Sequence, residues 1–364
     1  MMGNNMIGVS DVSLGFGSPQ INSIISYLYF KLGCSTALIL EPDQPEKKYN
    51  MYRYQPIILK RVYTEENIYQ GGRAEYIREC AKIINKEKPD MLLIFCSFTL
   101  PVLFYLNYRP RKVIYYNIEM ANAYGKDDII LNGAISGKVD LLIYPEENRA
   151  RIDIRDYGHR GMPMVTVYNC TNHVKDLAEV IGSTERNGKA IYAGKLDQTN
   201  TNVHYFFGKR NDKICIDVFG DISSCSSDFI KENLLHINEK MNFYGYVENQ
   251  KLQIIRKKYA YSIVMWNPVN ENQLYAAPNK FFEAIADGVI PICAPHPQCI
   301  KIIKKYDCGI LMKDWSYDSF CEAMTLAERI YGTQRYSEMV GNCRKAVTKE
   351  LNFESQMQYI EKYL

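Results

Sequence analysis

Lys280 and Glu283 are the two side chains whose types and spacing most directly indicate chemistry. They lie three residues apart, so they share one face of the helix that is predicted to begin at Pro278. A helix N-terminus presents unpaired N–H groups and the positive end of a dipole, so Lys280 and the backbone from Ala277 to Asn279 could bind a diphosphate. Glu283 could accept hydrogen bonds from two sugar hydroxyls. The alternative is a solvated face of an ordinary amphipathic helix.

The stretch 278–312 contains six residues in a recognisable order: Pro278, Lys280, Glu283, Gly288, Pro291 and Gly309. This order resembles the nucleotide-sugar motif of glycosyltransferases with the two-domain GT-B fold, and of family 4 in particular. The resemblance implies that Glu283 holds the ribose of a nucleotide diphosphate sugar, such as a UDP-sugar, and that nearby basic residues hold the diphosphate. It also implies a metal-independent reaction that retains the anomeric configuration.

The sequence departs from the family pattern at Tyr275. Family 4 members usually carry a second glutamate eight residues before the first, and Tyr275 occupies that position. Glu271 is out of register, so no role is carried over to it. Tyr275 therefore supports an alternative in which the chain binds a nucleotide sugar without turning it over.

Composition indicates a globular protein with two domains. The chain has 364 residues, of which 47% are hydrophobic and 23% are charged, and single cores stop growing near ~250–300 residues. A net charge of +3 does not indicate nucleic-acid binding. The 11 cysteines form no CxxC pair, which is typical of reduced thiols in the cytoplasm. Neither HExxH nor Asp-x-Asp occurs, so we expect no metal site.

Neither an export signal nor a membrane-spanning segment is expected. The segment 1–6 is too short and too polar for a signal peptide. The uncharged segment 91–108 is interrupted by Ser97, Thr99 and Pro101, so it fits a buried strand followed by a short helix better than a membrane span.

Strands and helices alternate along both halves, which predicts an α/β fold of two Rossmann-like domains whose parallel sheets face each other across a cleft. Predicted strands are 6–10, 36–40, 91–96, 112–117, 140–144, 164–168, 189–193, 213–219, 242–246, 261–266 and 289–294, and one more opens after Gly309. Predicted helices are 19–32, 75–86, one after Pro145, 228–240, 278–288, 298–306, 317–331, 335–351 and 354–364, with a loop at 267–277.

Four segments make up the predicted domain organisation. Residues 1–170 form an N-terminal Rossmann-like domain on the acceptor side, and the polar, turn-forming segment 171–188 is the linker. Residues 189–350 form the C-terminal Rossmann-like domain on the donor side. The resemblance implies that the helix in 351–364 packs back on the N-terminal domain.

A glycine loop follows the first predicted strand. Gly15 and Gly17 are expected to lie against the donor if the family resemblance holds. The same GxG pair, with Glu41 ending the next strand, imitates a dinucleotide fingerprint, but Gln20 stands where its third glycine would be. A dehydrogenase that binds NAD through this loop is therefore an alternative.

Acidic residues at strand ends supply candidates for the acceptor side. Glu119 directly follows the strand 112–117, where α/β sites form, and could take a proton from an acceptor hydroxyl or orient the acceptor. Asp11, after the first strand, is a weaker candidate for that role. A loop carboxylate that caps Asn122 or faces solvent is the alternative for Glu119.

The second half contains further candidates for the donor site. Gly194, Lys195 and Leu196 resemble the glycine, arginine, leucine segment that opens the family's second domain, so Lys195 is expected to neutralise a phosphate. The lysine that usually follows is missing, and Lys209 or Arg210 could replace it. At the end of the strand 242–246, Tyr246 and Val247 resemble the segment whose backbone meets the nucleotide base, although an ordinary core strand explains them equally well.

Together these residues predict a glycosyltransferase that uses no cofactor beyond its nucleotide-sugar donor. The acceptor would be a glycan, a lipid-linked glycan or a protein, in bacterial surface polysaccharide or glycoconjugate synthesis. Location would be cytoplasmic, with the basic segments 256–258 and 301–305 available for peripheral contact with the inner membrane face. An epimerase or hydrolase of the same fold would bind the same donor.

Overall fold

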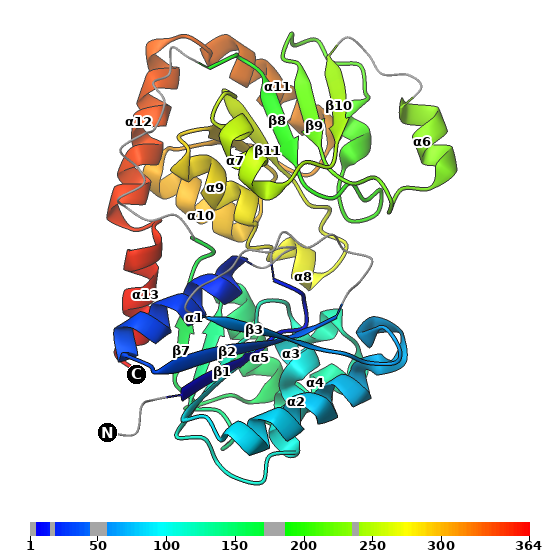
Figure 1. Ribbon diagram of the computed structural model, residues 1–364. Coiled ribbons are helices and arrows are strands. Elements are labelled where there is room, and N and C mark those ends of the chain that lie inside the picture. Colours follow the sequence, from blue (N-terminus) through cyan, green and yellow to red (C-terminus); the bar gives the residue numbers. More distant parts are fainter. Residues whose placement is uncertain (1–4, 15–18, 44–56, 171–185, 235–239) are drawn as a thin grey trace. The chain divides into compact units, whose positions relative to one another are not determined.

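The computed structural model describes residues 5–14, 19–43, 57–170, 186–234 and 240–364. Two compact units divide the chain. Unit 1 comprises Met1–Thr171 and Met357–Leu364, and unit 2 comprises Asn172–Gln356. Each unit contains one parallel β-sheet with helices connecting its strands (Figure 1).

Unit 1 is built on a seven-stranded sheet. Its strands are β1 (Asn5–Val9), β2 (Thr36–Pro42), β3 (Ile58–Val62), β4 (Met91–Phe95), β5 (Lys112–Tyr116), β6 (Leu141–Tyr144) and β7 (Met164–Thr166). Its helices are α1 (Pro19–Leu32), η1 (Ile68–Gly72), α2 (Arg73–Glu87), α3 (Cys96–Thr99), η2 (Leu100–Phe104), η3 (Ala121–Ala123), α4 (Lys126–Gly133) and α5 (Glu147–Tyr157).

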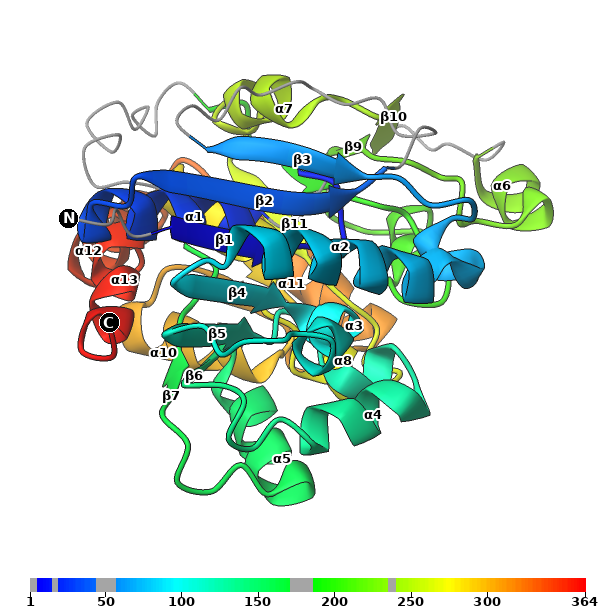
Figure 2. The ribbon, with the colours of Figure 1, turned by 60° about the horizontal axis from the view of Figure 1, so that its bottom comes forward.

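The strand order of this sheet is β3-β2-β1-β4-β5-β6-β7, and Figure 2 shows the strands in that succession. Every described pair is parallel. All five residues of β4 are buried, as expected for a strand covered on both faces. Helix α1 buries residues 21, 24, 25 and 28, the spacing of one helical face, and Gly33 then takes a positive φ of 58°.

Unit 2 is built on a six-stranded sheet. Its strands are β8 (Ala190–Ala193), β9 (Ile216–Phe219), β10 (Met241–Gly245), β11 (Tyr261–Val264), β12 (Ile290–Cys293) and β13 (Ile310–Leu311). Its helices are η6 (Val203–Phe206), α6 (Ser227–Leu234), α7 (Asn249–Arg256), α8 (Glu271–Leu274), α9 (Asn279–Ala286), α10 (Pro297–Tyr306), α11 (Tyr317–Ile330) and α12 (Gln334–Lys349).

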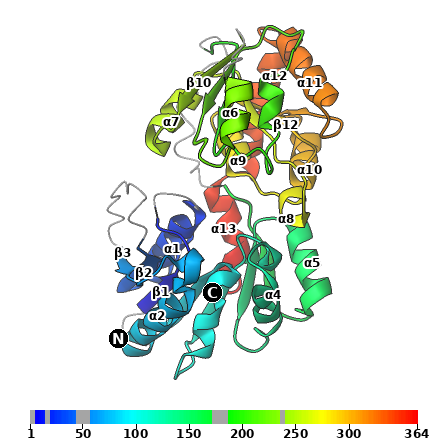
Figure 3. The ribbon, with the colours of Figure 1, turned by 90° about the vertical axis from the view of Figure 1, so that its right-hand side faces the viewer.

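The second sheet is also parallel, in the order β10-β9-β8-β11-β12-β13. Helix α9 packs on β11 and β12, and α12 packs against both α9 and α10 (Figures 1 and 3). The described part of the predicted linker begins at residue 186 and belongs to this packing. Arg186 is buried and donates hydrogen bonds to the carbonyl oxygens of Tyr259, at 3.0 Å, and Asp287, at 2.7 Å.

The last helix, α13 (Phe353–Glu361), crosses the division between the units, since unit 1 includes the chain from Met357 onward. Glu361 forms an ion pair with Lys31 of α1 at 2.8 Å and accepts a hydrogen bond from the hydroxyl of Tyr27. Both contacts lie within unit 1.

Two parallel-sheet α/β domains were predicted, and this fold class is confirmed. Several elements were not predicted, among them β3, α4, α7 and α8. Strand β3 lies at the sheet edge, alternates exposed and partly buried residues before the buried Val62, and carries Lys60 and Arg61, so it lacks an apolar run. Helix α7 was missed, and the predicted loop 267–277 contains the short helix α8.

We expect Gly220→Ala to destabilise unit 2. A Cβ at position 220 would lie 1.9 Å from the carbonyl oxygen of Gly194, so the ends of β8 and β9 would have to separate, at a cost of roughly 1–3 kcal/mol. Gly341→Ala is the matched control. It lies inside α12 with no atom near its added Cβ, so it should stabilise the chain by about 0.5–1 kcal/mol. Denaturant unfolding measures both changes, and equal effects would contradict this packing.

Candidate active site

The strand order of unit 2 reverses direction between β8 and β11. At such a switch point the connections leave the two strands in opposite directions, so a crevice opens outside their carboxyl ends. Gly194 directly follows β8, and Trp266 lies two residues after the end of β11. Residues that lie between these two strand ends are therefore the first candidates for ligand binding.

Lys280 occupies that position. It lies in the first turn of α9, which begins at Asn279, one residue later than predicted, with Pro278 at the N-cap position. The Nζ atom of Lys280 lies 4.1 Å from the ring centre of Tyr192, in β8, and 5.0 Å from that of Trp266. Both rings contribute cation–π attraction. A Cβ at Gly194 would lie 3.0 Å from Nζ, so a glycine is what lets the ammonium approach the backbone.

The ammonium of Lys280 is buried and has no hydrogen-bond partner among the described residues. Burial lowers its pKa to about 8, against the opposing effect of the Glu283 carboxylate. An ammonium has three donors, and leaving a buried charged group without a partner is costly. An anion that enters the crevice would satisfy both the charge and the donors.

Other buried polar atoms close to Lys280 in the chain also lack partners among the described residues. They are the indole Nε1 of Trp266, the amide oxygen of Asn279 and the amide oxygen of Gln273. The indole is a donor and suits an anion, whereas the two amide oxygens suit the hydroxyls of a sugar. Buried polar groups are normally paired, so these atoms are available to a ligand that enters the crevice.

Glu283 belongs to a buried ion cluster that sequence reasoning missed. The guanidinium of Arg256 is 3% exposed and lies 2.7 Å from a carboxylate oxygen of Glu283 and 2.7 Å from one of Asp287. The segment 256–258 was predicted to be available for peripheral membrane contact, but Arg256 itself is buried in this cluster. Its partner Glu283 is 18% exposed. Because Arg256 holds one oxygen of Glu283 in place, the carboxylate is oriented before any ligand binds.

His296 was also missed, and it positions the loop that carries Trp266. Its Nε2 accepts the backbone N–H of Trp266 at 3.3 Å, and its Nδ1 donates to the carbonyl oxygen of Leu274 at 3.2 Å. Burial lowers the pKa of His296 to about 4, so the ring is neutral at neutral pH and can make one donation and one acceptance. Nothing in its local sequence distinguishes it from other helix-flanking histidines.

The remaining predicted donor residues lie at the same edge of the sheet. Lys195 is exposed and follows Gly194, while its carbonyl oxygen accepts the hydroxyl of Tyr192 at 3.0 Å. Tyr246, 63% exposed, and Val247 follow β10, two strands away from β8. Ala277 is partly buried beside the start of α9. Gly15 and Gly17 lie outside the described residues.

Glu119 belongs to unit 1. Its side chain is 46% exposed and lies 3.4 Å from Arg149. The arginine of this ion pair is buried, at 5% exposed, and Glu119 forms no described cap on Asn122.

Lys209 and Arg210 do not join the candidate site. Lys209 lines a groove of about 610 Å³ between β13 and α11, whose lining contains none of the residues described above. Arg210 is buried and pairs with Asp212 at 3.4 Å. Their proposed substitution for the missing family lysine is therefore wrong.

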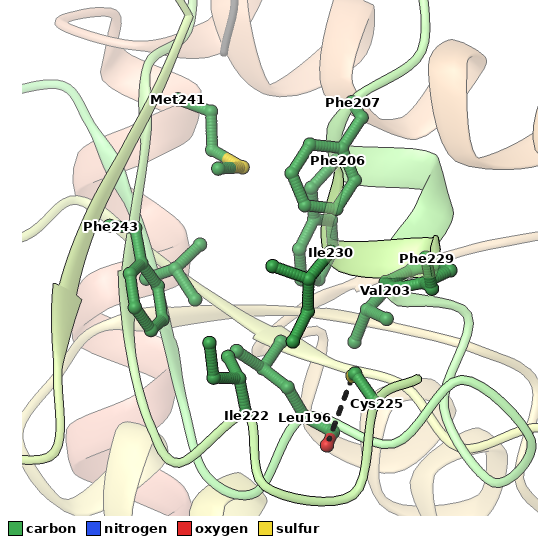
Figure 4. A pocket seen from close by; sticks show the side chains of 11 residues that line it. Leu196, Val203, Phe206, Phe207, Ile222, Cys225, Phe229, Ile230, Met241 and Phe243 are labelled. Carbon is green, nitrogen blue, oxygen red and sulfur yellow. Dashed lines mark hydrogen bonds between the residues drawn. The ribbon is translucent and has the colours of Figure 1, made fainter. Parts of the chain in front are cut away.

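A second hollow in unit 2 is apolar packing and not a ligand pocket. Figure 4 shows its lining side chains, which come from β9, β10, η6, α6 and the segments between them. The space is about 10 Å³, which is at the lower limit for one water molecule. Within the described ranges, no group of three or more His, Cys, Asp or Glu side chains could hold a metal ion, and no helix is long and apolar enough to cross a membrane.

Structural comparison identifies proteins with the same two-domain GT-B architecture. The chain matches HepE from Anabaena, solved in complex with UDP and glucose, with a TM-score of 0.73, 12% identity and coverage of 99% of this chain and 98% of that one. It matches a glycosyltransferase from Rickettsia africae with a TM-score of 0.70, 13% identity and coverage of 100% and 98%. Sucrose-phosphate synthase from Thermosynechococcus elongatus matches with a TM-score of 0.70, 11% identity and coverage of 99% and 98%. No family model and no curated sequence matches the chain.

We expect Lys280→Met to stabilise the ligand-free chain by roughly 1–3 kcal/mol, because it removes a buried charge without a partner. The stability difference between the wild-type chain and Lys280→Met also depends on pH. Since the folded pKa is about 8 and the usual value is 10.5, the unfolded chain binds more protons between those values, and wild-type stability rises with pH across that window. Lys280→Met should lack this rise.

Thermal unfolding of both proteins between about pH 7 and 10 measures this difference. Lys195→Met is the matched control, because Lys195 is exposed and its replacement should change stability by no more than about 0.5 kcal/mol. A loss of stability in Lys280→Met would show that the ammonium has a partner in the folded chain.

Proposed function

We propose that this protein is a glycosyltransferase that moves a sugar from a nucleotide diphosphate sugar, with UDP as the favoured nucleotide, to an acceptor hydroxyl. The observation that carries this proposal is the buried ammonium of Lys280, which lacks a partner at the switch point of unit 2. The GT-B architecture and the solved complexes of HepE with UDP and glucose support the same ligand class.

The departing diphosphate would be stabilised by protein groups. When the bond from the sugar to the diphosphate breaks, negative charge develops on the leaving oxygen. Lys280, Lys195 and the first N–H groups of α9 are the groups available to stabilise that charge. Loss of one preorganised contact of this kind typically costs ~10²–10³ in kcat. Because these groups are preorganised in the fold, we propose that the reaction requires no metal.

Glu283 would hold the ribose through the carboxylate oxygen that Arg256 leaves available. A carboxylate fixed by a buried guanidinium loses little side-chain freedom when the ribose binds, so the geometry of the donor is set in advance. Tyr246 and Val247 would meet the base. The acceptor, a glycan, lipid-linked glycan or protein, would bind on unit 1, where Glu119 can orient it.

We also propose that the reaction retains the anomeric configuration and belongs to bacterial surface polysaccharide or glycoconjugate synthesis. The proposed location is cytoplasmic, at the inner membrane face. They rest on the family resemblance of the segment 278–312. Lys257, Lys258 and Lys304 are the lysines assigned to contact with an anionic membrane, whereas Arg256 and Lys305 form ion pairs within the chain.

We expect one class of UDP-, GDP-, ADP-, CMP- or dTDP-sugar to raise the thermal unfolding temperature of the wild-type chain. Lys280→Met should lose this shift although it is itself more stable. NAD and NADP serve as controls for the dinucleotide alternative, and a shift from NAD alone would contradict the transferase. Release of free nucleotide without an acceptor would indicate a hydrolase. Binding without turnover would indicate a non-catalytic subunit, the alternative that Tyr275 supports.

Glu283→Gln and Asp287→Asn form a matched pair, since each carboxylate lies 2.7 Å from Arg256. Both variants weaken the buried ion cluster and should lower stability. Only Glu283→Gln should also weaken binding of the nucleotide sugar, by about tenfold or more, because the ribose contact is assigned to Glu283 alone. Titration calorimetry measures the two affinities, and equal losses would remove Glu283 from the donor site.

A further inference from the structure

The two loops that flank the switch point of unit 2 are joined to each other. One loop follows β8 and contains residues 197–201, and the other follows β11 and contains α8. Asn267 donates its backbone N–H to the carbonyl oxygen of Asn200 at 2.8 Å and its side-chain amide to that of Thr199 at 3.0 Å. The joined loops lie outside the carboxyl ends of both strands, where ligands of such folds bind.

Gln273, in α8, adds a contact between side chains to this junction. Its amide nitrogen Nε2 donates to Oδ1 of Asn200 at 3.2 Å. Its amide oxygen Oε1 is buried and has no hydrogen-bond partner among the described residues. Buried polar atoms are normally paired, so Oε1 is open to a hydrogen-bond donor that a ligand brings into the crevice.

A carboxylate determines which end of the Gln273 amide is the oxygen. Asp197 accepts the backbone N–H groups of Thr199 at 2.9 Å and Asn200 at 3.0 Å, and its Oδ2 lies 3.1 Å from Nδ2 of Asn200. An ionised carboxylate only accepts hydrogen bonds, so Asn200 turns its NH₂ group toward Asp197 and its oxygen toward Gln273. Gln273 must then turn its own NH₂ group toward Asn200. In this relay of Asp197, Asn200 and Gln273, the free end is an oxygen.

Asp197 is ionised at neutral pH, so the direction of the relay is fixed there. Burial alone would raise its pKa, but hydrogen bonds from Asn200 and Thr199 and the charge of Lys195 lower the pKa overall. The neighbouring Asn279 has no such constraint, because no hydrogen bond within the described residues fixes its side-chain amide. Gln273 is therefore the amide whose free end can be assigned as an acceptor.

Gln273 belongs to the neighbourhood of Lys280. The ring of His296 donates to the carbonyl oxygen of Leu274, the residue after Gln273, and accepts the backbone N–H of Trp266. The ring centre of Trp266 lies 5.0 Å from the ammonium of Lys280. The loop that carries Gln273 is thus held to the wall of the proposed diphosphate site. In a nucleotide sugar the sugar is joined directly to the diphosphate, so the sugar is the part that can reach Gln273.

We propose that Oε1 of Gln273 accepts a hydrogen bond from one hydroxyl of the transferred sugar and so selects the nucleotide sugar. This inference rests on the proposed transferase function and names the sugar class that its donor site takes. A fluorine or a carboxylate at the same place only accepts hydrogen bonds and would leave Oε1 unpaired. The preferred donor is therefore a neutral sugar with a free hydroxyl at that position, and not a sugar that is deoxygenated or oxidised to a carboxylate there.

Titration calorimetry with UDP, UDP-glucose and UDP-galactose tests this assignment, with another nucleotide in place of UDP if the thermal panel identifies one. Each sugar is compared with analogues in which fluorine replaces one hydroxyl at carbon 2, 3, 4 or 6. Fluorine is close to a hydroxyl in size but cannot donate. On the wild-type chain, fluorine at the position that Gln273 contacts should weaken binding by about 10–100-fold, because a buried acceptor is left unpaired.

Gln273→Leu should remove this penalty at one position and leave the other positions unchanged. The variant should bind the parent sugar about as weakly as the wild-type chain binds the fluorinated analogue. UDP alone should bind the variant and the wild-type chain equally, because it carries no sugar. Equal binding of UDP also shows that the variant is folded.

Two further variants separate hydroxyl recognition from a structural role. Gln273→Glu keeps an acceptor oxygen at this place, so it should keep the discrimination against the fluorinated analogue. Asp197→Asn replaces the carboxylate by a group that can also donate. The amides of Asn200 and Gln273 can then turn over, so the discrimination should shrink.

Asp221→Asn is the matched control for Asp197→Asn. Asp221 accepts the backbone N–H of Ser223 at 2.8 Å and its hydroxyl at 2.6 Å, and these hydrogen bonds and the charge of Lys195 lower its pKa. Within the described residues, Asp221 forms no side-chain hydrogen bond with Asn200 or Gln273. This variant should keep the full discrimination.

The proposed function and this inference fail in different ways. If no nucleotide and no nucleotide sugar binds the wild-type chain, the transferase function fails. If UDP and its sugars bind but the wild-type chain tolerates fluorine at all four positions, or Gln273→Leu keeps every penalty, the assignment of Gln273 is overturned while the donor site stands. If Asp221→Asn loses discrimination as Asp197→Asn does, the orienting role of Asp197 is overturned.

Discussion

The candidate site depends on the burial of one ammonium group. The Nζ of Lys280 lies over the rings of Tyr192 and Trp266, next to Gly194, and has no hydrogen-bond partner among the described residues. Unpaired buried charge lowers stability, so the folded chain retains here a cost that a bound anion would remove. Gly194 leaves room for the ammonium, the ring of Trp266 contacts it, and His296 accepts the backbone N–H of Trp266.

Each unit, taken by itself, carries an unneutralised titratable group at the switch point of its sheet. In unit 2 the group is Lys280, whose pKa burial lowers to about 8, and in unit 1 it is Asp11, whose pKa burial raises to about 6. Burial disfavours the charged form in both cases, but each group is still charged at neutral pH. In the proposed reaction, the cation at the switch point of unit 2 would stabilise the departing diphosphate.

Local sequence patterns predicted most strands and helices, whereas ion-pair and hydrogen-bond partners that are distant in sequence could not be predicted. Helix α1 has the predicted bounds, and α9 lies within one or two residues of its predicted ends, because periodicity, Pro278 and Gly288 are local signals. The ion pair of Glu283 with Arg256 joins residues 27 positions apart through a helix that was not predicted. Likewise, the sequence pointed to Lys280 as a phosphate ligand, but only packing reveals that its ammonium is buried without a partner.

The most direct test of this account is the titration of Lys280 itself. The ¹³Cε signal of this residue, identified by its absence from Lys280→Met, can be followed by NMR as a function of pH with and without UDP. The account predicts a midpoint near pH 8 in the free chain and a clear rise when UDP is bound, because the diphosphate stabilises the charged form. A midpoint near the usual value of a lysine, or one that UDP does not change, would contradict the central role of this ammonium.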